Sequence, residues 1–375
     1  MTVATALVSG NDPLPQLAEQ AVGMALKKSG LAQANGVLLF LTPDFARHAQ
    51  TTVTAVARAA QCMQVAGGIA AGVFTEEDWV LDRPAAAAMV FGRGMSLIHP
   101  DEANKQEAPI LCYTGGAFPE NWGSSPARFG GSFTGTVGYA DPVAWQQSRL
   151  DAQQRCSIHV LGARASLGVS SGLRLLGKPQ RITGSTGYDL QKLGRHGALD
   201  SLIRALPPEY RERPHLPLHR LMALLIGTDD LADAQSALAA GQHHPIAIVA
   251  ANGDGSLTLS ERTVPGQHLA WAIRQPLSAE TDMRQALARL AVESPAPSCA
   301  LMFSCIGRGP YFYGGEDRDR DILCVRFPGL PLLGIYGTGQ IAPATAGTNR
   351  QLQNAVVTAL LSKHAGKEAH VQSLA

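Results

Sequence analysis

Two segments in the second half of the chain place glycines and reactive side chains directly after short apolar runs. IGRG (306–309) follows ALMFSC (300–305), and GTGQ (337–340) follows LPLLGIY (330–336). Such runs are typical of buried strands, and glycines at strand ends let a backbone approach a bound molecule. Because ligands of α/β sheets commonly lie beside strand ends, we predict a ligand site at these junctions. Its predicted members are Cys305, Gly307, Arg308, Gly337, Gly339 and Gln340. Alternatively, the glycines serve tight turns alone.

Two of these side chains suit the recognition of a small polar molecule. The guanidinium group of Arg308 has the fork geometry that binds a carboxylate or a phosphate. The amide of Gln340 can donate and accept hydrogen bonds at the same time. We therefore predict that Arg308 clamps an anionic group and that Gln340 pairs with the same ligand.

Cys305 is a candidate nucleophile, because a nearby cation such as Arg308 favours the thiolate. A nucleophile also needs a base, and no histidine lies near Cys305 in the sequence. The plainer interpretation is a small buried thiol at a strand end. The other cysteines have no partner pattern, so we expect reduced thiols.

Histidine pairs are the first pattern that could bind a metal ion. His215 and His219 have the HxxxH spacing that would place both on one helix face, but Pro217 lies between them and breaks such a helix. The neighbouring pair 243–244 points in divergent directions on any regular element, without an accompanying cysteine or carboxylate pattern. We therefore expect no metal.

The run EDRDRD (316–321) is the second such pattern. On an extended chain its three aspartates would share a face and could hold a divalent cation. Because arginines alternate with them, we interpret the run instead as a solvated loop that neutralises its own charge.

The elements that must position these residues follow from hydrophobic periodicity. Helices are predicted at 14–29, from Pro43 to about Cys62, at 197–206 and at 279–291. Strands are predicted at 36–41, 85–91, 157–163, 168–176, 222–226, 300–305 and 330–336, with a hairpin over 245–259. The segment 110–141 indicates loops and short strands, and 352–361 fits a strand or a helix equally well. We find no tandem repeat.

Alternation of helices and buried strands predicts an α/β or α+β fold. We expect two halves, each a mixed β-sheet covered by helices, with a layered αββα arrangement as one option. The proline-rich segment 207–220 is the best candidate for a boundary between them.

Composition excludes several classes of protein. With 31 basic and 30 acidic residues the formal charge is +1, which disfavours dedicated binding to nucleic acid or to anionic membranes. The N-terminus lacks the basic region of a signal peptide, and no apolar run is long enough to span a bilayer. We therefore expect a cytoplasmic protein with neither nucleic acid nor membrane as a partner.

The second half of the chain resembles the C-terminal domain of the FIST family. The residues that carry this resemblance are ALMFSCIGRG (300–309) and LPLLGIYGTGQIAP (330–343), where the family typically has Cys-x-x-Arg after a strand and then Leu-Pro-x-x-Gly-x-Tyr-x-x-Gly-Glu. The segment 244–271 is similar to the hairpin region that precedes them. Upstream, VLLFLTPDF (37–45), the Gly67–Gly68 corner and the segment 169–199 resemble the N-terminal FIST domain.

This chain departs from the family pattern at two places. Gln340 stands where the family usually has Glu, so a carboxylate is missing and a cationic ligand is disfavoured there. The corner GGIAAGVFTE (67–76) replaces a threonine- or serine-containing Ala-Gly-Glu pattern, which puts that side of the site in doubt.

The resemblance implies a standalone cytoplasmic sensory protein of bacterial type with two domains, 1–206 and 207–375. It would bind a small anionic or amino-acid-like ligand and signal through a partner such as a histidine kinase or a cyclase. Gly172 and Tyr188 are further candidates for the ligand site. We expect no cofactor and no enzymatic activity. Three alternatives stay open: a haem-based nitric oxide sensor, an enzyme with Cys305 as nucleophile, and a protein-interaction scaffold.

Overall fold

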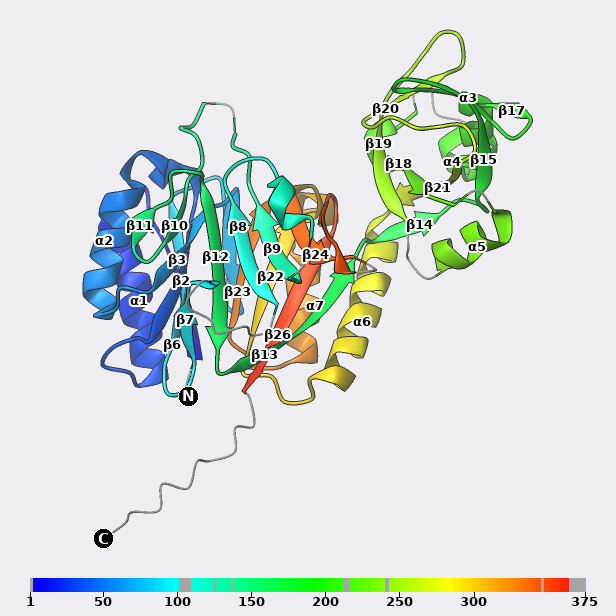
Figure 1. The fold of residues 1–375 in the computed structure, drawn as a ribbon. Coiled ribbons are helices and arrows are strands. Elements are labelled where there is room, and N and C mark those ends of the chain that lie inside the picture. Colours follow the sequence, from blue (N-terminus) through cyan, green and yellow to red (C-terminus); the bar gives the residue numbers. More distant parts are fainter. Residues whose placement is uncertain are drawn as a thin grey trace. The chain divides into compact units, whose positions relative to one another are not determined.

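The computed structural model describes residues 3–100, 109–124, 126–136, 138–211, 216–228, 230–239, 243–344 and 347–363. The chain divides into two compact units. Unit 1 comprises Met1–Ser170 and Met283–Ala375, and unit 2 comprises Ser171–Asp282. These units differ from the predicted domains 1–206 and 207–375, because unit 2 is built from strands on both sides of residue 206 (Figure 1). The two domains 1–206 and 207–375, which the family resemblance implies, stay a prediction.

The first sheet of unit 1 has two helices on its outer side. Its strands, in order, are β1 (Val3–Ser9), β6 (Ala85–Phe91), β2 (Gly36–Leu41), β3 (Val65–Ile69), β10 (Ala144–Gln146) and β11 (Arg149–Leu150). Helix α1 (Pro15–Ser29) joins β1 to β2, while the 3-10 turn η1 (Pro43–His48) and helix α2 (Ala49–Ala60) join β2 to the parallel strand β3. Small and apolar residues of α1 and α2 are buried against this sheet.

The second sheet of unit 1 repeats this arrangement. Its strands, in order, are β13 (Ala163–Ser170), β26 (Val356–Lys363), β22 (Cys299–Cys305), β23 (Leu332–Gly337), β4 (Gly72–Thr75) and β5 (Trp79–Leu81). The turns η5 (Ile306–Arg308) and η6 (Pro310–Tyr313) and helix α7 (Arg318–Arg326) join β22 to the parallel strand β23. An antiparallel strand lies beside the first strand of each β-α-β unit, β6 in one sheet and β26 in the other.

A third sheet completes unit 1. Its strands, in order, are β25 (Asn349–Leu352), β24 (Gly339–Pro343), β9 (Arg128–Ser132), β8 (Ile110–Thr114), β12 (Arg155–Leu161) and β7 (Ser96–Ile98). The short turn η3 (Glu120–Trp122) covers part of one face, where Trp122 packs with Ile110, Cys112 and Ile341.

One apolar core joins the three sheets. Phe303 of the second sheet makes ring contacts with Phe40 of the first sheet and Phe129 of the third, and Phe40 also contacts Tyr113 of the third. On β22 the residues alternate: Leu301 and its neighbours two positions away face this core, while Ala300 and Met302 pack on the other side against α7 and α6 (Pro276–Glu293). Unit 1 is therefore a layered structure with helices outside and sheets inside (Figure 1).

Unit 2 contains one sheet that closes on itself, because β18 pairs with both β19 and β21. Its strands, in order, are β14 (Leu173–Leu175), β21 (His268–Arg274), β15 (Gln180–Thr186), β16 (Asp189–Leu193), β20 (Leu257–Leu259), β19 (His244–Ala251) and β18 (Leu221–Ile226), with β17 (His196–Gly197) paired to β16. The helices are α3 (Ala198–Ala205), α4 (Pro208–Arg211) and α5 (Leu231–Ala239), and the turn η4 (Leu218–Arg220) precedes β18. Trp271 lies in the core, with Leu202 of α3 against it.

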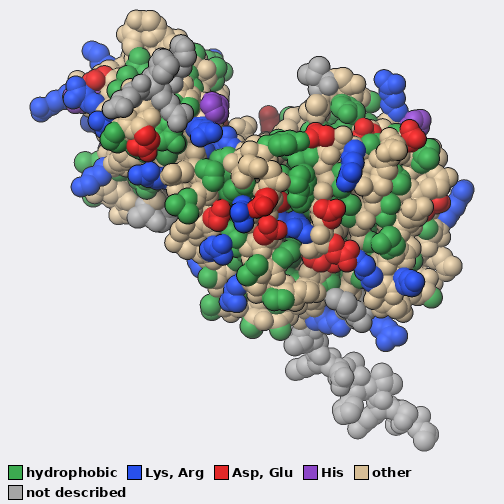
Figure 2. All heavy atoms as spheres, turned by 180° about the vertical axis from the view of Figure 1, so that it is seen from behind, with side chains coloured by type: hydrophobic (Ala, Val, Ile, Leu, Met, Phe, Trp, Pro, Cys, Tyr) green, Lys and Arg blue, Asp and Glu red, His purple; other side chains and the backbone are tan. Residues whose placement is uncertain are grey.

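The predicted fold class is confirmed: mixed sheets are covered by helices. The helices expected at 14–29, 197–206 and 279–291 correspond to α1, α3 and α6, and the segment 352–361, which was open between strand and helix, forms β26. Among the described residues, no helix combines the length and the apolar character that crossing a bilayer requires. Figure 2 shows Lys and Arg side chains interspersed with Asp and Glu on the face seen from behind.

We predict that Phe303→Ala lowers the free energy of unfolding by about 3–5 kcal/mol, because it leaves a cavity where the three sheets meet. Urea unfolding followed by circular dichroism measures this effect. The control is Val325→Ala on α7, whose side chain is 74% exposed, and which should change stability by at most about 0.5 kcal/mol. Equal effects of the two substitutions would contradict a shared core at Phe303.

Candidate functional site

The two glycine-containing junctions lie side by side. Strands β22 and β23 are parallel, and their register places Cys305 directly opposite Gly337. Both strands therefore end at the same edge of the second sheet, as the prediction required. From this edge the chain continues into η5 on one side and into β24 of the third sheet on the other.

Close backbone packing accounts for Gly337 in the second junction. A Cβ atom on Gly337 would lie 2.4 Å from the carbonyl oxygen of Ser132, so this position requires glycine. A Cβ atom on Gly339 would lie 2.1 Å from Nε2 of Gln351 and 2.6 Å from the Ser132 hydroxyl, but both are ends of side chains that can move aside. The alternative of a purely structural role thus fits Gly337, while Gly307 is exposed.

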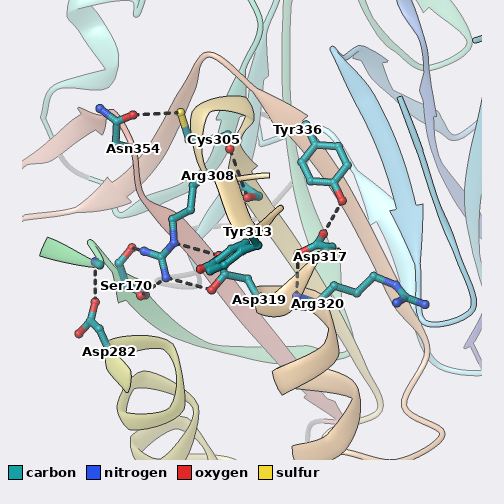
Figure 3. A network of polar contacts seen from close by, with 12 residues as sticks. Ser170, Asp282, Cys305, Arg308, Tyr313, Asp317, Asp319, Arg320, Tyr336 and Asn354 are labelled. Carbon is teal, nitrogen blue, oxygen red and sulfur yellow. Dashed lines mark hydrogen bonds and ion pairs between the residues drawn. The ribbon is translucent and has the colours of Figure 1, made fainter. Parts of the chain in front are cut away.

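Arg308 lies in a buried network rather than at a free surface. Its side chain is 2% exposed, and that of Asp319 is fully buried. Nε and Nη2 of Arg308 each donate to the Asp319 carboxylate at 2.9 Å, which is a bidentate pair. Nη1 donates to the Ser170 carbonyl at 2.8 Å and Nη2 to its hydroxyl at 2.7 Å (Figure 3). In this arrangement the guanidinium group faces Asp319 and Ser170, and a role as anion clamp stays a prediction.

Electrostatics support this pairing. Burial disfavours the charged form of Arg308, but the adjacent Asp319 carboxylate outweighs it and raises the pKa of Arg308. The Tyr313 hydroxyl donates to Asp319 at 3.0 Å. Burial and then the Asp319 charge raise the pKa of Tyr313. The Asp319 carboxylate therefore favours the charged form of the buried Arg308 guanidinium group.

The run 316–321 was expected to be a solvated loop, and this expectation is wrong. Asp317 and Asp319 are both buried, and the run begins helix α7. The Asp317 carboxylate accepts a hydrogen bond from the backbone N–H of Arg320 and so caps the helix, and it also accepts from the hydroxyl of Tyr336 on β23 (Figure 3). Arg320 in turn donates to the Thr75 carbonyl at 2.7 Å, which anchors α7 to the end of β4.

Sequence reasoning missed that Asp317 and Asp319 are buried members of this polar network. The signal that could have found them is the spacing of Asp317 and Arg320, which places an acceptor at a helix N-cap three residues before its donor. Asp319 gives no comparable local signal, because its partner Arg308 lies 11 residues earlier in the chain, before the turn η6. Among the described residues, no group of His, Cys, Asp and Glu has the arrangement of a metal site, and His215 lies outside them.

Cys305 has one polar neighbour in the network. Its Sγ atom lies 4.0 Å from Oδ1 of Asn354, and its side chain is buried. Asn354 has a φ of 56°, the left-handed conformation that asparagine tolerates better than most residues. An amide is no general base, so this contact gives Cys305 no partner for nucleophilic catalysis.

Gln340 is the most unusual of the predicted site residues. Its side chain is fully buried, yet neither Oε1 nor Nε2 has a hydrogen-bond partner among the described residues. The register pairs Gln340 with Leu352 and with Gly131. A Cβ atom on Gly131 would point toward Phe303 and Ile335 of the core. The amide thus points to the apolar side of the third sheet.

Arg350 lies on the same face of the third sheet as Gln340. It is paired with Ala342, two residues along β24 from Gln340. Since residues alternate along a strand, Arg350 and Gln340 are diagonal neighbours. Burial lowers the pKa of Arg350 from its ordinary value.

Gly172 and Tyr188 belong to unit 2, whereas the other predicted site residues belong to unit 1. The backbone N–H of Gly172 donates to the Asp282 carboxylate at 2.9 Å, and its φ of 64° favours glycine. Tyr188 is half-exposed, and the guanidinium carbon of Arg262 lies 5.3 Å from its ring centre. Both contacts lie within unit 2.

Comparison with known proteins supports the C-terminal resemblance. Residues 198–343 match the FIST C domain, which includes both junctions and Gln340. The resemblance to an N-terminal FIST domain stays a prediction.

The relatives are proteins without a described function. An uncharacterized protein of Mycobacterium tuberculosis is 28% identical over 211 residues, which are 51% of this chain and 49% of that protein. An uncharacterized protein of Mycobacterium bovis is 26% identical over 299 residues, which are 76% of this chain and 73% of that protein. The chain thus spans about half the length of the first of these relatives.

We predict that Asp319→Asn lowers the free energy of unfolding by about 3–5 kcal/mol, because it leaves the buried guanidinium group of Arg308 without its counter-charge. Chemical unfolding measures the change. In the control Asp321→Asn the lost ion pair is partly exposed, so the expected loss is below about 1 kcal/mol. If the two variants are equally stable, the buried guanidinium group of Arg308 does not need the Asp319 carboxylate as its counter-charge.

Asp317 gives a prediction about pH. Burial raises the pKa of Asp317 from 3.8 to about 6, so the folded state binds this proton more tightly than the unfolded state. Its contribution to stability is therefore present at low pH and lost as the pH rises through 6. Between pH 5 and 8 wild type should lose about 1–2 kcal/mol relative to Asp317→Asn. If the free energy of unfolding changes with pH in the same way in both proteins, the pKa of Asp317 is not raised in the folded state.

Proposed function

We propose that this protein is a sensory protein that binds a small anionic or amino-acid-like ligand. The single observation that carries the proposal is Gln340, a fully buried amide in the segment that matches the FIST C domain, neither of whose side-chain polar atoms has a hydrogen-bond partner in the described structure. Leaving buried polar atoms unpaired destabilises a fold by about 1–3 kcal/mol. A ligand that accepts from Nε2 and donates to Oε1 would remove this penalty.

The charge of the ligand follows from the neighbour of Gln340. Arg350 lies diagonally across from it on the same face, at the roughly 7–8 Å that separates such pairs in an antiparallel sheet. Arg350 is a half-buried cation, and its positive charge would attract a carboxylate of the ligand. A carboxylate with an adjacent hydrogen-bond donor, as in an amino acid, therefore suits both side chains. In this proposal Arg350 binds the anionic group, which is the role that the sequence analysis predicts for Arg308.

In this proposal the signal passes to a separate partner such as a histidine kinase or a cyclase. The strand that carries Gln340 continues directly from β23, whose Tyr336 contacts Asp317 at the start of α7. A ligand at Gln340 would therefore change the packing of a strand that is tied to a helix on the outside of unit 1.

A thermal-shift screen of amino acids and small carboxylates tests the proposal. A ligand that binds only the folded state raises the melting temperature. In Gln340→Leu the shift should disappear, while the free energy of unfolding without ligand stays equal or rises by about 1 kcal/mol because no buried amide is left unpaired.

Gln351→Leu is the matched control. Gln351 lies on the neighbouring strand β25, and its Nε2 donates to the Ser132 hydroxyl at 2.7 Å. Its loss should lower the free energy of unfolding by about 1–2 kcal/mol and leave the ligand shift in place. A screen in which no compound raises the melting temperature, or a shift that survives Gln340→Leu, would refute this function.

A further inference from the structure

The face of the third sheet opposite Gln340 carries a cluster of polar side chains. Arg128 of β9, Cys112 of β8, and Ser157 and His159 of β12 lie on this face, and the ring of Trp122 packs near Cys112 and Arg128. The register explains their proximity: Arg128 is opposite Ile110, and Ser157 is opposite Cys112. His159 alternates with Ile158 and Val160 of the apolar core and therefore points away from that core.

Arg128 is a half-buried cation that has no ion pair with a carboxylate of the described residues. Nη1 donates to Sγ of Cys112 at 3.1 Å, and the guanidinium carbon lies 5.4 Å from the ring centre of Trp122. Nε is buried and has no hydrogen-bond partner among the described residues. None of the ion pairs in the described part of the chain includes Arg128. Burial raises the pKa of Cys112, so its thiol supplies no negative charge.

His159 supplies a second unpaired group. Its side chain is 4% exposed, and Nδ1 is buried without a partner in the described structure. Burial, and then the positive charge of Arg128, lower the pKa of His159. The register also places them near one another: Arg128 is opposite Ile110, and His159 follows Ile158, which is opposite Leu111 on the other side of the same strand.

Asn349 holds the loop over this cluster in place. Its Nδ2 donates to the carbonyl groups of Trp122, Ser124 and Pro126 at 2.8–2.9 Å, and its Oδ1 accepts from the backbone N–H of Arg128 at 2.8 Å. These bonds hold the backbone at Trp122 and at Arg128 in a set geometry. The Arg128 side chain is placed further by its contacts with Cys112 and the Trp122 ring.

We propose that Arg128 and His159 bind a small oxyanion, a phosphoryl or carboxylate group, on this face of the third sheet. An oxyanion would accept a charge-assisted hydrogen bond from Nε of Arg128 and another from the imidazole, which offsets the burial of both groups. The site is independent of the ligand proposed at Gln340, because the two lie on opposite faces of the sheet.

Titration with inorganic phosphate and with acetate, at constant ionic strength, tests this site and distinguishes its two chemistries. Binding of phosphate alone indicates a phosphoryl group, and binding of acetate alone a carboxylate. Arg128→Met keeps the apolar stem over Trp122 and should weaken binding about tenfold or more. The control Arg164→Met removes an exposed arginine of β13 and should leave the affinity unchanged.

A measurement on the wild-type protein guards against misfolding of the variant. In a spectrum of histidine-labelled protein, the Cε1 resonance of His159, assigned by its loss in His159→Gln, should move in step with the bound fraction. The proposal is overturned if neither anion binds, if Arg164→Met weakens binding as much as Arg128→Met, or if the His159 resonance stays still while an anion binds elsewhere.

Discussion

Unit 1 depends on two places where consecutive strands of the chain belong to different sheets. β3 in the first sheet is followed at once by β4 in the second, and β23 in the second by β24 in the third. Each crossing requires glycine where backbones meet: a Cβ on Gly72 would lie 2.6 Å from the Val80 carbonyl oxygen, and one on Gly337 would meet that of Ser132. The crossings hold three sheets around the rings of Phe40 and Phe303.

Buried charges are arranged around the second crossing. The pair Arg308 and Asp319 links η5 to α7 and to the last residue of β13, while Asp317 links the start of α7 to Tyr336 on β23. Breaking such a buried pair is far more destabilising than forming it is stabilising. The network therefore specifies where α7 lies. Helix α7 covers the face of the second sheet that points away from the core shared by the three sheets.

The third sheet carries unsatisfied polar groups on both faces, which is unusual for a sheet packed on each side. Gln340 points to the apolar face, and Arg128 and His159 to the other. Native folds pair nearly all their buried polar atoms. Among the described residues such groups occur mainly in the sheet that the second crossing enters, with Trp145 Nε1 of the first sheet as another, and they are the basis of the two binding proposals.

The sequence by itself determined the local elements and the fold class, because hydrophobic period, proline and glycine act within a few residues. It also predicted one site at the ends of β22 and β23. The two ends do lie side by side, because these strands are parallel neighbours in the second sheet. Only the tertiary structure decided what each side chain there does. Arg308 contacts Ser170, 138 residues away. Gly337 packs against the carbonyl oxygen of Ser132, and Asp317 and Asp319 are buried. Burial and charge pairing depend on neighbours distant in the chain, and a pattern of residue types does not carry that information.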